Sequence, residues 1–123
     1  MKLLMVEDDA TTVETIRLCL EIYLPTLTLE ATGKGLEALQ MLKQGDYKGI
    51  LVDLGLPDID GIELIEKLRT FSQVPIVVLS ARNNPEVISR TLDLGADEYV
   101  TKPFDCWNLL ELLDKKMIKV NPQ

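Results

Sequence analysis

The sequence predicts a single α/β domain in which five β–α units form a doubly wound parallel sheet. Two observations lead to this fold class. Short apolar runs alternate with amphipathic stretches from one end of the chain to the other. The amphipathic stretches are bounded by residues that typically begin or end helices, so strands and helices should alternate strictly, which favours a parallel sheet covered on both faces. The 123 residues suit one domain.

Five apolar runs are the expected strands: Leu3–Val6, Leu27–Ala31, Ile50–Val52, Ile76–Leu79 and Tyr99–Thr101. The first, third and fourth are continuously apolar, as is typical of strands buried on both faces. The second alternates, and the fifth is short and mixed, so both suit sheet edges. With right-handed crossovers, these assignments give the strand order 2-1-3-4-5 of flavodoxin-like sheets.

Helical periodicity fills the segments between the expected strands. The first stripe consists of Val13, Ile16, Leu20 and Leu24. Pro25 should end that helix, because the residue before a proline is disfavoured in the α conformation. The second stripe consists of Leu36, Leu39 and Leu42. Gly45 should close the second helix.

The three later helices carry clearer start signals. Asp60, followed three residues later by Glu63, resembles a capping box. The third helix should then bury Ile62, Ile65 and Leu68. Asn84 and Pro85 suit the N-cap and first position of the fourth helix, and Gly95 should follow its end. The last helix is expected over residues 105–119, which leaves 120–123 as a tail or the start of a linker.

Composition limits the classes of partner. Asp and Glu outnumber Lys and Arg by 20 to 13, which argues against nucleic-acid binding by this domain. The opening run Met1–Val6 is too short for a signal peptide, and no run reaches the ~18 apolar residues of a membrane span. Cys19 and Cys106 lack metal-ligand spacing and are expected to be unpaired thiols, as in a reducing cytosol. We therefore expect a cytoplasmic protein.

Polar residues follow the strands that lead into the expected carboxyl edge of the sheet. Glu7, Asp8 and Asp9 follow the first strand, Asp53 the third, Ser80 the fourth and Lys102 the fifth. Parallel strands bring these positions to one edge, where open α/β folds place their ligands. Neighbouring carboxylates repel one another unless a cation or proton intervenes. Oxygen ligands without His or Cys suit a hard ion, so the pattern predicts a Mg²⁺ site.

Each of these residues also has a purely structural interpretation. Asp9 is better explained as the N-cap of the first helix than as a ligand. Ser80 suits a strand-end cap, Lys102 a solvated turn, and Asp53 the start of a turn. Charges at Glu7 and Asp8, at the end of a buried strand, do need partners. Coincidence at all four strand ends is a weaker explanation than a shared site.

Four segments resemble the receiver domains of two-component signalling. They are Leu4–Asp9, Val52–Pro57 with Asp60 and Gly61, Leu79–Ala81, and Gly95–Phe104. The resemblance runs from Met1 to about Lys119. It implies that Asp53 accepts a phosphoryl group, that Asp8 binds Mg²⁺ directly, and that Glu7 does so through a water. It also implies that Gly55 offers a backbone carbonyl to the metal.

The same resemblance assigns the switch and the partners. Ser80 matches the switch hydroxyl, Tyr99 the switch aromatic, and Lys102 the phosphate-binding lysine before a proline whose peptide is typically cis. The implied role is a signalling phospho-acceptor rather than an enzyme. Its donor would be a sensor histidine kinase or a phosphotransfer protein. The output would be transcription through a separate DNA-binding domain or, alternatively, protein–protein interaction by a stand-alone receiver.

Two positions depart from the resemblance. Gly55 is smaller than the residue usual two places after the acceptor, so water should reach a phosphoryl group more easily. Asn108 and Leu112 replace the Glu and Arg of winged-helix regulators of the OmpR type. We therefore expect at most a weak homodimer through the fourth helix, fifth strand and fifth helix, resting on apolar residues such as Leu92 and Leu110.

Three rival interpretations remain. A haloacid-dehalogenase-type phosphatase would need a second acid at the position of Gly55. A flavodoxin-like cofactor binder would need a phosphate-cradling loop where Glu7–Asp9 would repel phosphate. A degenerate receiver that only binds partners usually lacks the acceptor or the lysine, and this chain has both Asp53 and Lys102.

Overall fold

The computed structural model describes residues 1–118 and contains one five-stranded parallel sheet. The strands are β1 (Lys2–Val6), β2 (Thr28–Thr32), β3 (Tyr47–Val52), β4 (Ile76–Ser80) and β5 (Glu98–Thr101). The helices are α1 (Ala10–Tyr23), α2 (Gly35–Gln44), α3 (Gly61–Arg69), α4 (Pro85–Asp93) and α5 (Cys106–Leu113), which continues as a π-helical segment, η1 (Asp114–Ile118). The order β2-β1-β3-β4-β5 confirms the predicted sheet.

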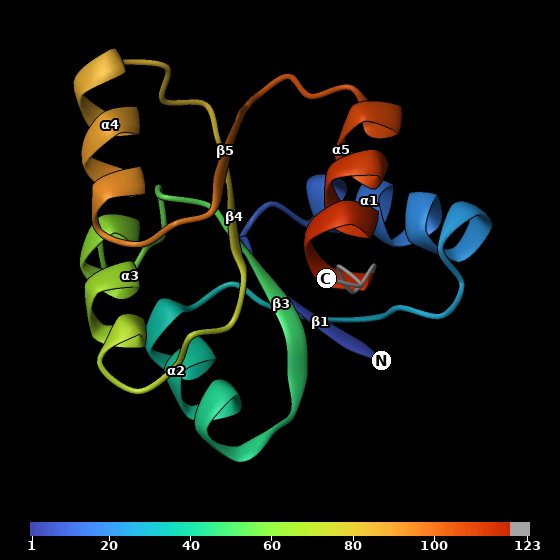
Figure 1. Cartoon of the computed structure of the whole chain (residues 1–123), viewed down its shortest axis with the longest axis horizontal. Coiled ribbons are helices and arrows are strands. Elements are labelled where there is room, and N and C mark those ends of the chain that lie inside the picture. Colours follow the sequence, from blue (N-terminus) through green and yellow to red (C-terminus); the bar gives the residue numbers. More distant parts are fainter. Residues whose placement is uncertain (119–123) are drawn as a thin grey trace, which may run out of the picture.

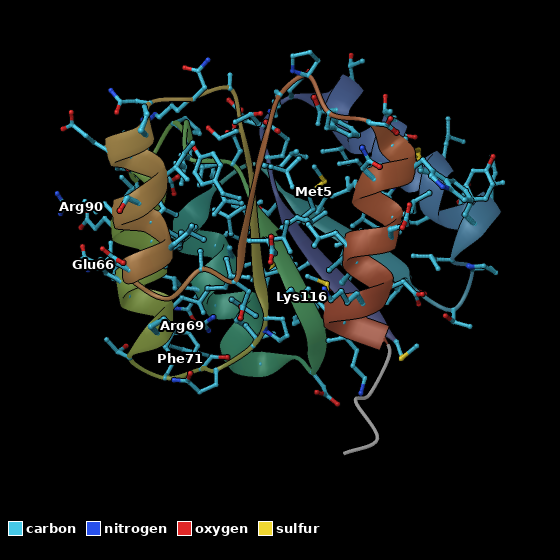
Figure 2. All side chains as sticks on the ribbon, turned by 45° about the horizontal axis from the view of Figure 1, so that its top comes forward. Met5, Glu66, Arg69, Phe71, Arg90 and Lys116 are labelled. Atoms are coloured by element: carbon cyan, nitrogen blue, oxygen red, sulfur yellow. A yellow bond between two sulfur atoms is a disulfide. The ribbon has the colours of Figure 1, made fainter. Side chains whose placement is uncertain are left out.

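Helices cover both faces of the sheet (Figure 1). Helices α1 and α5 pack on one face, and α2, α3 and α4 pack on the other. Alternate residues of the central strands therefore enter two different cores: Met5 enters the α1–α5 core and Leu4 the opposite one. Figure 2 shows Met5 between the two helical layers. Burial on both faces explains why β1, β3 and β4 are apolar.

Most helix boundaries follow the predicted signals. Asp9, Asp60 and Asn84 each accept a hydrogen bond from a backbone N–H in the first turn of the helix that follows. Gly95, after α4, has φ +118°, a left-handed conformation that favours glycine. In a complete capping box the Glu63 carboxylate would accept a hydrogen bond from the Asp60 N–H. Here the carboxylate instead lies 3.9 Å from Lys67 Nζ on its own helix, so the capping box is incomplete.

The predicted face of α2 is partly wrong. Leu36 is 52% exposed, whereas Gly35 and Ala38 are buried. A Cβ at Gly35 would lie 2.3 Å from Ile59 Cγ2, so the bare glycine lets the loop after β3 pack tightly against the start of α2. This approach turns Leu36 outward. In α3, Ile62 is only partly buried, while Leu64 lies in the core beside Ile65 and Leu68.

The end of the chain also differs from the prediction. The last α-helix stops at Leu113, and the π-helical segment follows to Ile118. Residue 119 and the expected tail over 120–123 lie outside the described residues. Leu110 is 5% exposed and belongs to the α1–α5 core, so its predicted role in a dimer surface is wrong. Within residues 1–118, every helix falls short of the length and apolarity that a bilayer span requires.

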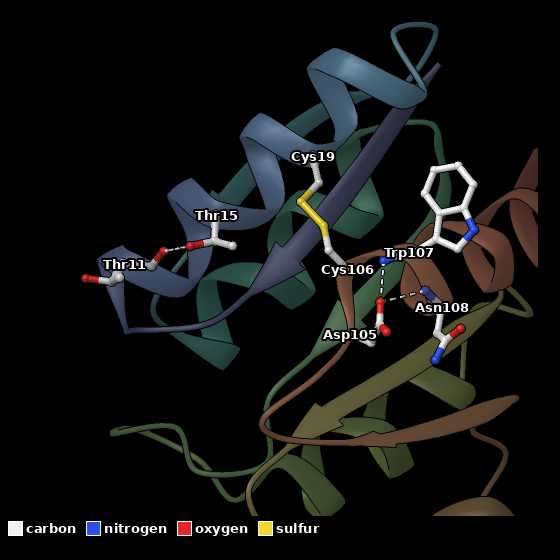
Figure 3. Close-up of a disulfide and its surroundings, with 7 residues drawn as sticks. All are labelled: Thr11, Thr15, Cys19, Asp105, Cys106, Trp107 and Asn108. Atoms are coloured by element: carbon white, nitrogen blue, oxygen red, sulfur yellow. Dashed lines mark hydrogen bonds between the residues drawn. A yellow bond between two sulfur atoms is a disulfide. The ribbon is translucent and has the colours of Figure 1, made fainter.

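Cys19 of α1 and Cys106 of α5 form a disulfide, with 6.9 Å between their Cα atoms (Figure 3). The prediction of unpaired thiols is therefore wrong. The two residues are 87 positions apart, and only the packing of α1 against α5 brings them together. Trp107, the next residue, packs edge-on against Tyr23 with 5.3 Å between ring centroids. The bond thus joins the two helices that cover one face of the sheet.

Candidate functional site

The carboxyl edge of the sheet gathers three acids from two neighbouring strands. Glu7 and Asp8 follow β1, and Asp53 follows β3, whose register pairs Val6 with Val52. Each acid offers a carboxylate oxygen, and these oxygens lie within 4.8 Å of one another. Glu7 is buried, Asp53 is half-buried and Asp8 is exposed. The structure therefore brings together the three side chains that the sequence predicted as metal ligands.

Lys102 provides the positive charge of the site. Its Nζ lies 2.5 Å from Glu7 Oε1 and 3.9 Å from Asp53 Oδ2. The lysine follows β5, and its backbone N–H donates to the Ser80 carbonyl at 2.8 Å, which fixes it beside the end of β4. The Lys102–Pro103 peptide is cis, as predicted.

The balance of charges favours a cation in this site. Burial raises the pKa of Glu7, the hydrogen bond from Lys102 opposes that rise, and the charge of Asp53 adds to it. Three carboxylates against one ammonium leave a surplus of negative charge. A donor set made only of oxygens suits Mg²⁺. These residues therefore fit the predicted ion, while the role of the Gly55 carbonyl stays a prediction.

Ser80 and Tyr99 both contact Arg82, a residue that the sequence suggested as a possible shield of the acceptor but whose contacts it did not reveal. The buried Ser80 Oγ accepts from the Arg82 backbone N–H at 3.2 Å. The Tyr99 hydroxyl donates to the Arg82 carbonyl at 2.8 Å. Arg82 Nη2 in turn lies 3.6 Å from Asp60 Oδ2 at the start of α3. The contact with Ser80 is local, but Tyr99 and Asp60 come from distant segments, so no local spacing could have indicated the whole arrangement.

Asp9 lies outside the metal cluster, in agreement with its structural interpretation. Its Oδ1 accepts from the Thr11 N–H at 3.2 Å, and its Oδ2 from the Thr12 hydroxyl at 2.7 Å. These hydrogen bonds, chiefly that from Thr12, lower the pKa of Asp9. Asp9 thus caps α1 and lies apart from the cluster of Glu7, Asp8 and Asp53.

The loop after β3, which carries Gly55, is held against α2 by the carboxylate of Asp58. Asp58 Oδ1 accepts from the Gly35 N–H at 2.9 Å, and Asp58 Oδ2 from the Leu36 N–H at 3.0 Å. These bonds tie the loop to the first turn of α2. A hollow of about 640 Å³ opens between that turn and α1, and Glu7 and Asp8 form part of its lining. Asp8, the exposed acid of the three, is therefore accessible from this side of the edge.

The fold and this constellation define a receiver-type phospho-acceptor class, and comparison with known proteins places the chain within it. Residues 3–114 match the family model described as the response regulator receiver domain. This chain therefore belongs to the response regulator receiver domain family. The family consists of signalling phospho-acceptor domains rather than classical enzymes.

Curated relatives support the same family. The chain is 42% identical over 106 residues to a transcriptional regulatory protein CpxR homolog of Haemophilus influenzae, covering 85% of this chain and 44% of the relative. It is 40% identical over 106 residues to the transcriptional regulatory protein KdpE of Staphylococcus aureus, again covering 85% and 44%. The chain thus spans less than half the length of these relatives.

Solved structures agree with the fold. The receiver domain of the Francisella response regulator 1452 has a TM-score of 0.87 and 29% identity, covering 94% of this chain and 95% of that one. The BeF₃-activated receiver domain of Klebsiella pneumoniae RstA has a TM-score of 0.89 and 26% identity, covering 97% and 100%. The receiver domain of the Pseudomonas aeruginosa kinase PA1611 (TM-score 0.84, 25% identity, 96% and 98% covered) holds magnesium in its active-site cleft.

Proposed function

We propose that this chain accepts a phosphoryl group on Asp53 in a Mg²⁺-dependent reaction and changes conformation in consequence. One observation carries the proposal. Asp53 lies where two further carboxylates, Glu7 and Asp8, and the ammonium of Lys102 converge. The carboxylates offer a metal site, and the ammonium offers a fixed positive charge beside the acceptor.

In the proposed reaction, an Asp53 carboxylate oxygen attacks the phosphorus of the donor. The new oxygen–phosphorus bond forms as the bond to the donor's leaving atom breaks, and that atom keeps the electron pair. The product is an acyl phosphate on Asp53. Attack by an anion on an anionic group is slow without positive charge nearby, so Lys102 has the role of neutralising a phosphoryl oxygen.

Asp8, Asp53 and the Gly55 carbonyl would hold Mg²⁺ directly, and Glu7 would hold it through a water. When bound, the ion would supply positive charge that offsets the negative charge of the acceptor and of the phosphoryl group. Glu7 also orients the Lys102 ammonium, to which it is already hydrogen-bonded. Glu7 thus helps to hold the positive charge of Lys102 beside the acceptor Asp53.

The conformational change would use the two side chains that contact Arg82. On phosphorylation, the Ser80 hydroxyl turns toward the new oxygens and gives up the Arg82 N–H. Tyr99, half-exposed here and hydrogen-bonded to the Arg82 carbonyl, then moves inward. Such a coupled rearrangement is a two-state switch whose balance phosphorylation shifts.

The proposed donor is a sensor histidine kinase or a phosphotransfer protein. The proposed output is control of transcription in the cytoplasm through a separate DNA-binding domain. This output rests on the curated relatives, which are named transcriptional regulators and are more than twice as long as the matched segment. The alternative is a receiver that acts by protein–protein interaction.

Intact-mass measurement tests the proposal. The chain is incubated with acetyl phosphate, with and without Mg²⁺. The expected result is one added phosphoryl group that requires both Mg²⁺ and Asp53, so that Asp53→Ala gains none. Asp9→Asn is the control, because Asp9 is an adjacent acid outside the cluster. Equal mass gain in Asp53→Ala would contradict the proposal.

A further inference from the structure

Arg82 connects three parts of the site. Its backbone N–H is bound to Ser80 Oγ, its carbonyl to the Tyr99 hydroxyl, and its guanidinium lies beside Asp60. The backbone contacts fix where the side chain begins, next to the end of β4. The ion pair fixes where the side chain ends, at Asp60, the N-cap residue of α3. The side chain therefore extends from the end of β4 toward the segment that follows β3.

Asp60, beside which the Arg82 guanidinium lies, is connected to the acceptor Asp53 through Gly55. Asp60 pairs with Gly55 in an antiparallel bridge, and the Gly55 N–H donates to Asp53 Oδ1 at 3.4 Å. Apart from its two chain neighbours, a Cβ built at Gly55 would meet only Asp53 Oδ2 among the described atoms within 4.0 Å. The space beside Gly55 is therefore open next to the acceptor, and Asp60, which holds the guanidinium, is bridged to that same glycine.

The ion pair that holds Arg82 is weak. Its atoms are 3.6 Å apart, and the side chains of Arg82 and Asp60 are 41% and 50% exposed. Exposed pairs of this kind favour the paired state by at most about fivefold. A phosphoryl group carries up to about two negative charges and three acceptor oxygens, and guanidinium groups bind it in a charge-assisted, bidentate manner. A phosphoryl group on Asp53 would therefore be a stronger partner than Asp60.

We propose that Arg82 is a second cationic ligand of the phosphoryl group, which it binds by leaving Asp60. This inference rests on the proposed phosphorylation of Asp53. Asp60 competes for the guanidinium and so weakens the phosphorylated state. Because Ser80 and Tyr99 hold the backbone of the same residue, the exchange takes place where the two switch side chains meet.

Beryllofluoride, a phosphoryl mimic that binds carboxylates, tests the exchange by fluorine NMR in the presence of Mg²⁺. Arg82→Ala should weaken beryllofluoride binding by about tenfold, the loss expected for a charge-assisted hydrogen bond. Asp60→Asn should tighten binding by about threefold, because it removes the competing charge. Asn caps helices as well as Asp does, so the cap of α3 on the Ile62 N–H remains.

Three further variants give the test its controls. Arg90→Ala removes a guanidinium from α4, and Glu63→Gln removes a charge from α3; both should leave binding unchanged within about twofold. In the double variant of Arg82→Ala and Asp60→Asn, the gain from Asp60→Asn should disappear, because Asp60 acts only through Arg82. Thermal unfolding of each variant confirms that it is folded.

The outcomes separate this inference from the proposed function. Wild type that binds no beryllofluoride and gains no phosphoryl group would overturn both. Wild type that binds while Arg82→Ala binds equally well would overturn the role of Arg82 alone. A gain from Asp60→Asn that persists without Arg82 would show that Asp60 acts directly on the site, and would overturn the exchange.

Discussion

Lys102 is bonded to Glu7 more closely than to Asp53: its Nζ lies 2.5 Å from Glu7 Oε1 and 3.9 Å from Asp53 Oδ2. The ammonium thus neutralises the most buried acid of the site and remains near the acceptor. A phosphoryl group on Asp53 would compete with Glu7 for this ammonium. The two acids after β1 therefore differ in their surroundings: Glu7 is buried and bonded to Lys102, whereas Asp8 is exposed and lacks that contact.

Mg²⁺ binding should therefore depend more on Asp8 than on Glu7. Asp8→Asn removes a charge and a direct ligand of the metal together. Glu7→Gln removes only a water-mediated contact, so it should lower the affinity for Mg²⁺ by about tenfold and Asp8→Asn should lower it further. Calorimetric titration with Mg²⁺ measures both variants. Asp9→Asn, the neighbouring cap, should change the affinity by no more than about twofold. Equal losses in Asp8→Asn and Glu7→Gln, or an inverted order, would count against the assigned roles.

Phosphorylated wild type should lose its phosphoryl group faster than Gly55→Met. The space beside Gly55 is open, so a methionine fits there and obstructs an attacking water. The rate of decay after removal of the donor is the measurement, and a several-fold slower decay in Gly55→Met is expected. The comparison is repeated with Arg82→Ala in both proteins, so that displacement of Arg82 cannot account for the difference. Slower decay in wild type would reverse this view of Gly55.

The Cys19–Cys106 bond should protect both thiols from alkylation until a reductant is added. Mass analysis after iodoacetamide treatment counts the modified thiols, none before reduction and both after it. Because the bond closes a loop of 87 residues, its reduction should lower the free energy of unfolding by about 2–4 kcal/mol. Urea unfolding with and without reductant measures this loss, and Cys19→Ser with Cys106→Ser is the control, which should not respond. Complete alkylation of unreduced, folded protein would contradict the bond.

Asp58 should contribute to acid sensitivity. The N–H groups of Leu36 and Gly35 lower the pKa of Asp58 in the folded state. Its contribution is therefore complete above the unfolded-state pKa of about 3.9 and is lost as the pH falls through the lower folded value. Urea midpoints near neutral pH and in acid should show a smaller acid-induced loss for Asp58→Asn than for wild type. Identical pH profiles would show that the loop does not depend on this carboxylate.

Unphosphorylated protein should be a monomer or a weak dimer. The acids of the predicted dimer face already have partners within the chain: Asp97 pairs with Arg69 at 3.3 Å and Glu98 with Lys116 at 3.4 Å. Leu92 is exposed on this face, whereas Leu110 is not. Arg69 and Lys116 are labelled in Figure 2. Sedimentation across a salt series is the measurement, and a tight dimer that dissociates steeply with salt would contradict the prediction.

The sheet order and the convergence of acids could be predicted because they depend on local signals. Continuous apolar runs identified the central strands, and parallel topology then placed Asp53 beside Glu7 and Asp8. Capping residues such as Asn84 act within one turn, so they too could be read from spacing. The cluster of acids thus followed from topology without any knowledge of side-chain positions.

Features that depend on packing between distant segments could not be predicted. The exposure of Leu36 follows from the contact between Gly35 and Ile59, which periodicity cannot reveal. The disulfide requires that α1 and α5 lie side by side, and the distance between these helices cannot be read from residue spacing. The position of Arg82 beside Tyr99 and Asp60 likewise requires β5 and the start of α3 to lie next to the end of β4.

The central claim is that Asp53 is the acceptor, and reductive trapping tests it most directly. Borohydride converts an aspartyl phosphate to homoserine, so treatment after incubation with acetyl phosphate and Mg²⁺ marks the modified residue for peptide mapping. The account predicts homoserine at position 53 only, and none when the donor is omitted. Homoserine at Asp8 or Asp9, with Asp53 unchanged, would contradict it.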